Sequence, residues 1–144
     1  MPGQPTLGSN VAFGIDATAI HVTDNDGIPS QLVLDADKQI KINLVFEIDG
    51  LVIPSMNGAK YKVTYAFAPL ANTPAFTTAL ERSLKTSLPH PTKVYQGADT
   101  EVKIPAGTVK PGLYQLSAFV QFPDNPGIAA FATLPVIEVI KEQP

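Results

Sequence analysis

The chain has 144 residues, of which 44% are hydrophobic and 16% charged, and its formal net charge is −3. This length is typical of one domain, and the hydrophobic share supports a packed core and excludes an intrinsically disordered chain. The 10 basic residues form no cluster against the 13 acidic ones, so no nucleic-acid-binding surface is expected. The absence of cysteine excludes disulfides, thiol nucleophiles and thiolate metal sites.

No apolar stretch approaches the ~20 residues of a membrane span, so no membrane insertion is expected. The opening MPGQPTLGSN has neither the basic start nor the apolar run of a signal peptide. A chain without cysteine suits both a reducing cytoplasm and a mature exported domain, and the sequence leaves the compartment unknown.

The first elements are predicted to be strands. Residues 1–9 carry two prolines and two glycines and are expected to form a loose lead-in, so that a single domain spans residues 10–141. Apolar residues alternate over 10–23, which predicts a strand, and the Asp, Asn and Gly residues at 24–27 predict a turn. A short second strand is predicted over 31–34.

Two longer alternating segments follow. In residues 39–53 the apolar side chains fall on one face and the charged ones on the other, with Val45 as the apolar exception on the charged face. Residues 59–68 place aromatic and β-branched side chains on one face, a composition that favours a strand.

The pattern then changes to a repeat of four. Phe76 and the leucines at 80, 84 and 88 recur at every fourth position, which predicts a helical stripe. Thr73 before Pro74 fits an N-cap followed by proline in the first turn, and further prolines after Leu88 end the element. The sequence therefore predicts one short helix over residues 74–88.

The last third returns to strands. A strand is predicted over 100–104, then a corner rich in proline and glycine, and then a strand from Tyr114 to Phe122 in which every second residue is apolar. A hairpin turn over 122–127 leads to a final strand over 128–140. Pro135 has no amide donor, so this strand is expected to be interrupted there or to lie at a sheet edge.

About seven short strands separated by turn residues predict an all-β sandwich. The stretch VKIPAGTVKPGLYQLSAFVQF, residues 102–122, resembles the E-to-F corner of immunoglobulin-like and fibronectin-type-III-like domains, of the cysteine-free bacterial kind. The resemblance covers roughly residues 38–140 and implies an immunoglobulin-like antiparallel β-sandwich, with the helix as a decoration. It also implies a structural role for Tyr114, whose hydroxyl would bond back to the corner. Leu116 stands where antibody-type domains have a cysteine, and a generic β-barrel is the main structural alternative.

Few side chains point to chemistry. The two histidines, His21 and His90, have no carboxylate at a spacing that would orient a base. Asp24, Asp26 and Asp35 are the only metal candidates, but the ligands between them that a calcium loop requires are missing, and we expect neither a metal nor a cofactor.

Motifs for nucleophilic, phosphate-binding, zinc-dependent or dinucleotide-dependent catalysis are absent from the sequence, so no catalytic residue is assigned and we do not expect an enzyme. A hydrolase whose carboxylates meet only in the folded chain is kept as a third hypothesis.

Misplaced apolar side chains are more informative. Phe119 lies on the polar face of its strand, as Val45 does on its own, and both are interface candidates. We expect the predicted helix to cover one of them. Tyr95 is the one tyrosine expected to be exposed, and it is the candidate ligand platform.

The leading hypothesis is a non-enzymatic immunoglobulin-like module for protein–protein interaction or self-association, with a protein partner or a homo-oligomer as the assembly. The alternative is a β-sandwich that binds a carbohydrate or a small ligand. Fold resemblance alone does not decide between them.

Overall fold

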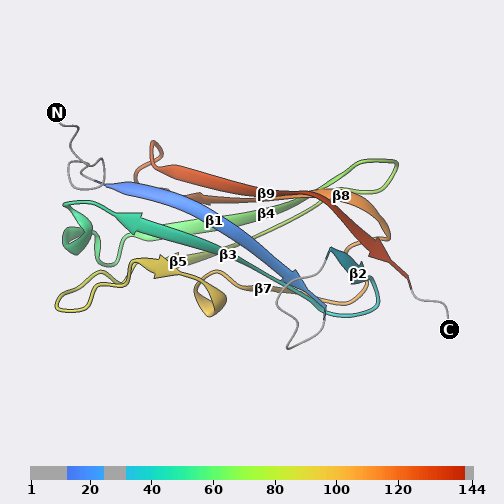
Figure 1. Ribbon diagram of the computed structural model, residues 1–144, viewed down its shortest axis with the longest axis horizontal. Helices are drawn as coiled ribbons and strands as arrows, with labels where there is room; N and C mark the ends of the chain where they lie inside the picture. Colours follow the sequence, from blue (N-terminus) through green and yellow to red (C-terminus); the bar gives the residue numbers. More distant parts are fainter. Residues whose placement is uncertain (1–12, 25–31, 142–144) are drawn as a thin grey trace.

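The computed structural model describes residues 13–24 and 32–141, which form two β-sheets. This part contains nine strands, the 3-10 turns η1 (Ile53–Met56) and η2 (Gly97–Asp99), and no α-helix. The long strands run roughly along the long axis of the molecule (Figure 1). They are β1 (Gly14–Thr23), β2 (Val33–Asp35), β3 (Ile40–Asp49), β4 (Lys60–Pro69), β5 (Phe76–Ser83), β6 (Val94–Tyr95), β7 (Val102–Ile104), β8 (Gly112–Gln121) and β9 (Ala129–Ile140).

The sheets differ in size and curvature. In the four-stranded sheet, β3 pairs with β1 and also with both β6 and β7. The five-stranded sheet has the order β2-β9-β8-β4-β5 and is strongly curled. It is mixed, because β2 runs parallel to β9 while the other pairs are antiparallel.

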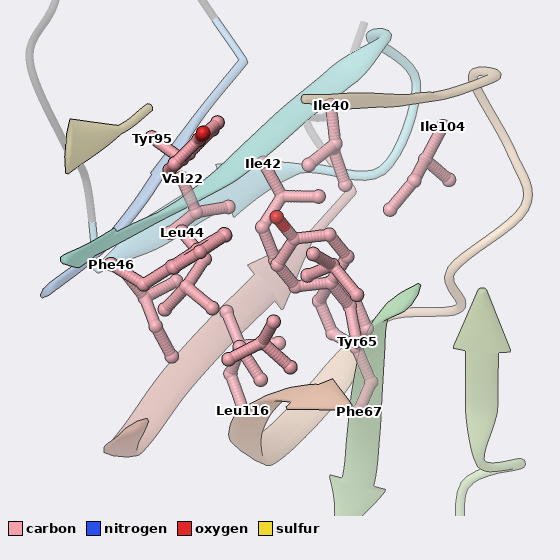
Figure 2. Close-up of a cluster of buried hydrophobic side chains, with 14 of the residues drawn as sticks. Val22, Ile40, Ile42, Leu44, Phe46, Tyr65, Phe67, Tyr95, Ile104 and Leu116 are labelled. Carbon is pink, nitrogen blue, oxygen red and sulfur yellow. The ribbon is translucent and has the colours of Figure 1, made fainter. Parts of the chain in front are cut away.

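The core lies between the sheets and follows from the alternation. Ile42, Leu44 and Phe46 of β3 point inward toward Tyr65, Phe67 and Leu116 of the other sheet (Figure 2). The apolar residues predicted to share one face of β8, such as Leu116 and Val120, are fully buried. A strand with one buried face was therefore the correct prediction for this segment.

A buried hydroxyl completes the pairing of β3. β7 pairs with the start of β3 and β6 pairs with its end, and between them the chain leaves the sheet to form η2. The backbone amide and carbonyl groups of Leu44 face this gap. The fully buried Thr100 hydroxyl donates to the Leu44 carbonyl oxygen at 2.6 Å and accepts from the Leu44 amide at 3.0 Å. A side chain thus replaces the missing backbone partner, as a buried peptide group requires.

Two tyrosines of the opposite sheet bind the same segment. The Tyr65 hydroxyl donates to the Thr100 carbonyl oxygen at 2.6 Å, and the Tyr61 hydroxyl donates to that of Asp99 at 2.7 Å. Both tyrosines come from β4, so hydrogen bonds as well as apolar packing connect the two sheets.

The corner before β8 forms as the sequence indicated. Tyr114 is fully buried, and its hydroxyl donates to the carbonyl oxygen of Lys110. Gly112 permits a close approach here, since a Cβ atom at this position would lie 2.7 Å from Cγ2 of Thr73. Tyr114 therefore connects the corner to the core.

The helix predicted over residues 74–88 is wrong. Residues Phe76–Ser83 form β5, which pairs with β4 from Phe67↔Phe76 to Lys60↔Ser83. A spacing of four is also twice the spacing of two, so Phe76 and Leu80 share one face of a strand as readily as one face of a helix. The β-branched Thr77 and Thr78 favour the strand.

Pro135 interrupts the pairing of β9 with β8, although β9 itself continues through it from Ala129 to Ile140. The pairing of β8 with β9 shifts between Tyr114↔Ile137 and Leu116↔Leu134, which leaves Pro135 at a β-bulge. A residue without an amide donor is accommodated at such a position.

We predict that Thr100→Val, which keeps the shape and removes the hydroxyl, lowers the free energy of unfolding by about 2–4 kcal/mol. Two buried backbone groups of Leu44 lose their partner, at ~1–3 kcal/mol each. Urea unfolding measures the change. Thr108→Val, at an exposed loop position, is the control and should stay within ~0.5 kcal/mol of the parent.

Candidate functional site: the outer face of the five-stranded sheet

The outward side chains of β5, β4, β8 and β9 lie in rows across the sheet, because the strands pair in register. Among these outward side chains, charged residues occur only toward the ends of the strands, with Lys60, Lys62 and Glu81 at one end and Glu138 at the other. We call the area between them the uncharged face. Its residues are Thr64, Ala66, Ala68, Thr77, Ala79, Gln115, Ser117, Phe119, Phe131 and Thr133.

The outer face of the four-stranded sheet has the opposite character. Its β1–β3 register pairs Asp16 with Glu47, and its β3–β7 register pairs Lys41 with Lys103. A solvated sheet face normally carries such charged side chains. The uncharged face therefore differs from the ordinary solvated surface of the same molecule.

Two phenylalanines stand on the uncharged face. Phe119 is 41% exposed and Phe131 is 64% exposed, and their ring centroids lie 6.0 Å apart at 33°. They are register partners on β8 and β9. Burying the remaining exposed area of each ring would contribute about 1–2 kcal/mol, so the pair (the Phe pair) is the strongest apolar contact point of this surface.

The register explains how the Phe pair forms. The hairpin turn between β8 and β9 is closed by bonds from the Asn125 amide to the Phe122 oxygen and from the Ile128 amide to the Asn125 oxygen. The turn is thus centred on Asn125, and residues equally far from it face each other. Sequence reasoning found Phe119 but missed Phe131. The signal that could have located Phe131 is that it follows Asn125 by as many residues as Phe119 precedes it.

The uncharged face has a bulky half and a small half. One row reads Ala79, Thr64, Phe119 and Phe131 across β5, β4, β8 and β9. The next row reads Thr77, Ala66, Ser117 and Thr133. The aromatic rings therefore stand on β8 and β9 beside a low surface of alanine and threonine on β4 and β5.

A hollow of about 350 Å³ lies at the Lys62 end of this face. Its lining includes the polar side chains of Lys62, Glu81 and Gln121, together with Phe122 and two prolines of the β8–β9 turn. Charged and amide groups beside an apolar wall are the ordinary composition of a small-ligand site.

The structure does not bring the two predicted interface residues together. Val45 lies on the outer face of the four-stranded sheet, half-buried and opposite Ala19 at a bulge of β1. Phe119 lies on the other sheet. The expectation that the predicted helix covers one of them is wrong, because residues Phe76–Ser83 form β5, which lies beside β4 in the same sheet as Phe119.

Tyr95 does not form an exposed platform, contrary to the expectation from sequence. It is 1% exposed, and its ring stacks on Phe46 with centroids 5.0 Å apart. Its hydroxyl donates to the Thr92 carbonyl oxygen and accepts from the Lys85 amide, each at 3.0 Å. Both the ring and the hydroxyl are used inside the protein, so no ligand can stack on Tyr95.

The aspartates considered for a metal bind backbone amides. Asp24 accepts from the Asp35 amide at 2.6 Å, and Asp35 accepts from the Asp37 amide at 2.8 Å. Asp26 lies outside the described residues. Across residues 13–24 and 32–141, no group of three or more His, Asp or Glu side chains is arranged to hold a metal ion.

The remaining titratable candidates are scattered. His21 is half-buried in β1 opposite Asn43, and His90 is exposed in the segment after β5. The 350 Å³ hollow has one carboxylate, Glu81, and a smaller hollow of about 160 Å³ has one, Asp37. Neither hollow offers the pair of acids that glycoside hydrolysis uses.

The core tyrosines have perturbed acidity. Burial raises the pKa of Tyr61, Tyr65 and Tyr95 above the ordinary value of 10.0. For Tyr61 the carboxylate of Asp99 adds to the effect of burial, while for Tyr65 the hydrogen bond with Thr100 partly offsets it. These groups stay protonated at neutral pH and serve as hydrogen-bond donors.

No protein-family model matches this chain, and no curated protein sequence is significantly similar to it. None of the helical turns in the described ranges is long and apolar enough to cross a membrane.

We predict a loss of stability in alkali. A phenol whose pKa is higher in the folded than in the unfolded state contributes stability that is complete below pH 10 and declines as the pH rises above it. The free energy of unfolding should fall by up to ~1.4 kcal/mol per pH unit for each tyrosine concerned. Urea unfolding between pH 8 and about 11 measures the slope, which should be shallower in Tyr65→Phe. An unchanged slope in that variant would contradict the assignment.

Proposed function

We propose that the protein is a non-enzymatic immunoglobulin-like module that binds another protein surface through the uncharged face. Immunoglobulin-like sandwiches place strands A, B and E in one sheet and G, F, C and C′ in the other. The pairing of β1, β3 and β7 matches the first set, and the order β9-β8-β4-β5 matches the second. In this comparison Tyr114, at the start of β8 and bonded back to Lys110, would correspond to the corner tyrosine of strand F, which supports the proposal.

The exposed Phe pair within the uncharged face is the observation that carries this proposal. Soluble proteins seldom leave contiguous apolar area on the surface without a use for it. The centre of a protein–protein interface is depleted of charge and enriched in aromatic residues. The uncharged face has both properties, and the outer face of the other sheet has neither.

The absence of catalysis is inferred from what the polar side chains do. The carboxylates of Asp24 and Asp35 accept backbone amides, and the core tyrosines donate to backbone carbonyl groups. These groups have structural partners, which supports a scaffold with a binding surface.

Cross-linking from the face itself tests the proposal. We expect p-benzoylphenylalanine at position 131, introduced in cells that make the protein, to form a covalent adduct with another polypeptide on irradiation. The same residue at position 94 is the control, because Val94 is 40% exposed on the other sheet. Equal labelling from both positions, or none from position 131, would exclude the uncharged face as a binding surface.

A carbohydrate- or small-ligand-binding role is the second candidate, and the 350 Å³ hollow favours it. If a sugar binds in this hollow, NMR titration of the isotope-labelled protein with a panel of sugars should shift the backbone amide signals of Lys62 and Gln121. Lys62→Gln should weaken that binding. Signals that stay fixed over the whole panel would remove this candidate.

A further inference from the structure

Resting on the small-ligand role that is the second candidate above, and going beyond protein binding, we propose that the hollow of about 350 Å³ binds a small zwitterion, an α-amino acid with an apolar side chain. Its volume lies at the lower end of the range of about 300–1,000 Å³ that is usual for small-molecule pockets. Three polar side chains and an apolar wall line the hollow, and each of them fits one part of such a ligand.

The polar side of the hollow is one row of the sheet. The register places Lys62 of β4 between Glu81 of β5 and Gln121 of β8, and all three side chains are exposed. Directly opposite residues on neighbouring antiparallel strands have Cβ atoms about 4.5–5.5 Å apart. A cation, an anion and an amide therefore stand side by side on the outer surface.

The two charges of this row have no internal partner in the part of the chain that the structure describes. Opposite charges directly across a strand pair attract each other. Among residues 13–24 and 32–141, however, the Lys62 ammonium and the Glu81 carboxylate form no ion pair with each other and no hydrogen bond with another group. By contrast, the Lys110 ammonium in the smaller hollow donates to the Gly107 carbonyl oxygen at 3.2 Å. Both charged groups of the larger hollow are therefore open to a ligand.

A ligand that carries both charges fits the row best. A carboxylate bound to Lys62 lies close to the carboxylate of Glu81, so a ligand with one charge meets repulsion as well as attraction. An uncharged sugar supplies no counter-charge to either group. In a zwitterion, the carboxylate accepts from Lys62 and from the amide of Gln121, while the ammonium donates to Glu81.

The other side of the hollow favours an apolar side chain. Phe122, Pro123 and Pro126 line it, and proline has no amide hydrogen to donate. Phe122 is held in place, because its ring is 1% exposed and meets the ring of Phe13 edge-on with centroids 5.7 Å apart. Its carbonyl oxygen accepts from the Asn125 amide at 2.9 Å. The wall is therefore pre-formed, and an aliphatic side chain such as that of leucine would lie against it.

NMR titration with three probes that share one aliphatic group tests the site. L-leucine carries both charges, 4-methylpentanoate lacks the ammonium, and 3-methylbutylamine lacks the carboxylate. L-leucine should shift the backbone amide signal of Gln121 with a dissociation constant in the millimolar range, because the charged groups are exposed and screened. Each singly charged probe should bind about three- to tenfold more weakly, since it loses one charge-assisted contact.

Variants that remove one charge assign each contact. Glu81→Gln should weaken the binding of L-leucine about three- to tenfold without weakening that of 4-methylpentanoate, which has no ammonium. Lys62→Gln should weaken the binding of L-leucine by a similar factor without weakening that of 3-methylbutylamine. Glu47→Gln and Lys103→Gln are the matched controls, because both residues are exposed on the four-stranded sheet. Both controls should bind L-leucine like the wild type.

The outcomes separate this inference from the proposed function. A Gln121 signal that stays fixed up to about 50 mM L-leucine overturns the zwitterion. So does 4-methylpentanoate that binds as tightly as L-leucine, or L-leucine binding that Glu81→Gln leaves unchanged. A sugar that shifts the signal where L-leucine does not overturns the zwitterion and leaves the small-ligand role in place. Protein binding is tested separately, because the cross-link at position 131 reports on the Phe pair.

Discussion

The contact between the Thr100 hydroxyl and the backbone of Leu44 is the constraint on which the two-sheet fold depends. It lies at the centre of β3, opposite the gap where the chain between β6 and β7 leaves the sheet to form η2. It satisfies two peptide groups of Leu44 that water cannot reach. Tyr65 of the facing sheet donates to the carbonyl of the same threonine. One residue thus joins two strands within a sheet and the two sheets to each other.

This arrangement leaves the outer surfaces free to differ. The core uses the inward half of every long strand, and the buried hydroxyl groups of Tyr61, Tyr65 and Thr100 bond to backbone. The outward positions of the five-stranded sheet lie outside this core. Their alanine, threonine and phenylalanine side chains support the partner surface that we propose, since the outer face of the other sheet carries charge.

The sequence predicted much of the fold, because alternation is a local signal. It identified β3, β4 and β8 and the corner at Tyr114. It mistook β5 for a helix, since apolar residues at every fourth position satisfy both periods. Phe119 was visible as a break in alternation, but its neighbour Phe131 depends on the centre of a turn, which a pattern does not show. Tyr95 was misplaced because β6 has two residues, too few for any alternation to appear.

The parallel pairing of β2 with β9 has a consequence for biosynthesis. Val33 lies beside Glu138, so the two strands that meet are separated by most of the chain. Until residues 129–140 have been made, β8 lacks one neighbour, and β2 lacks the strand beside which it lies in the described part of the sheet. The pairing of β2 with β9 is therefore one of the last contacts that the described strands can make as the chain grows, and a contact between segments so far apart in the sequence forms slowly.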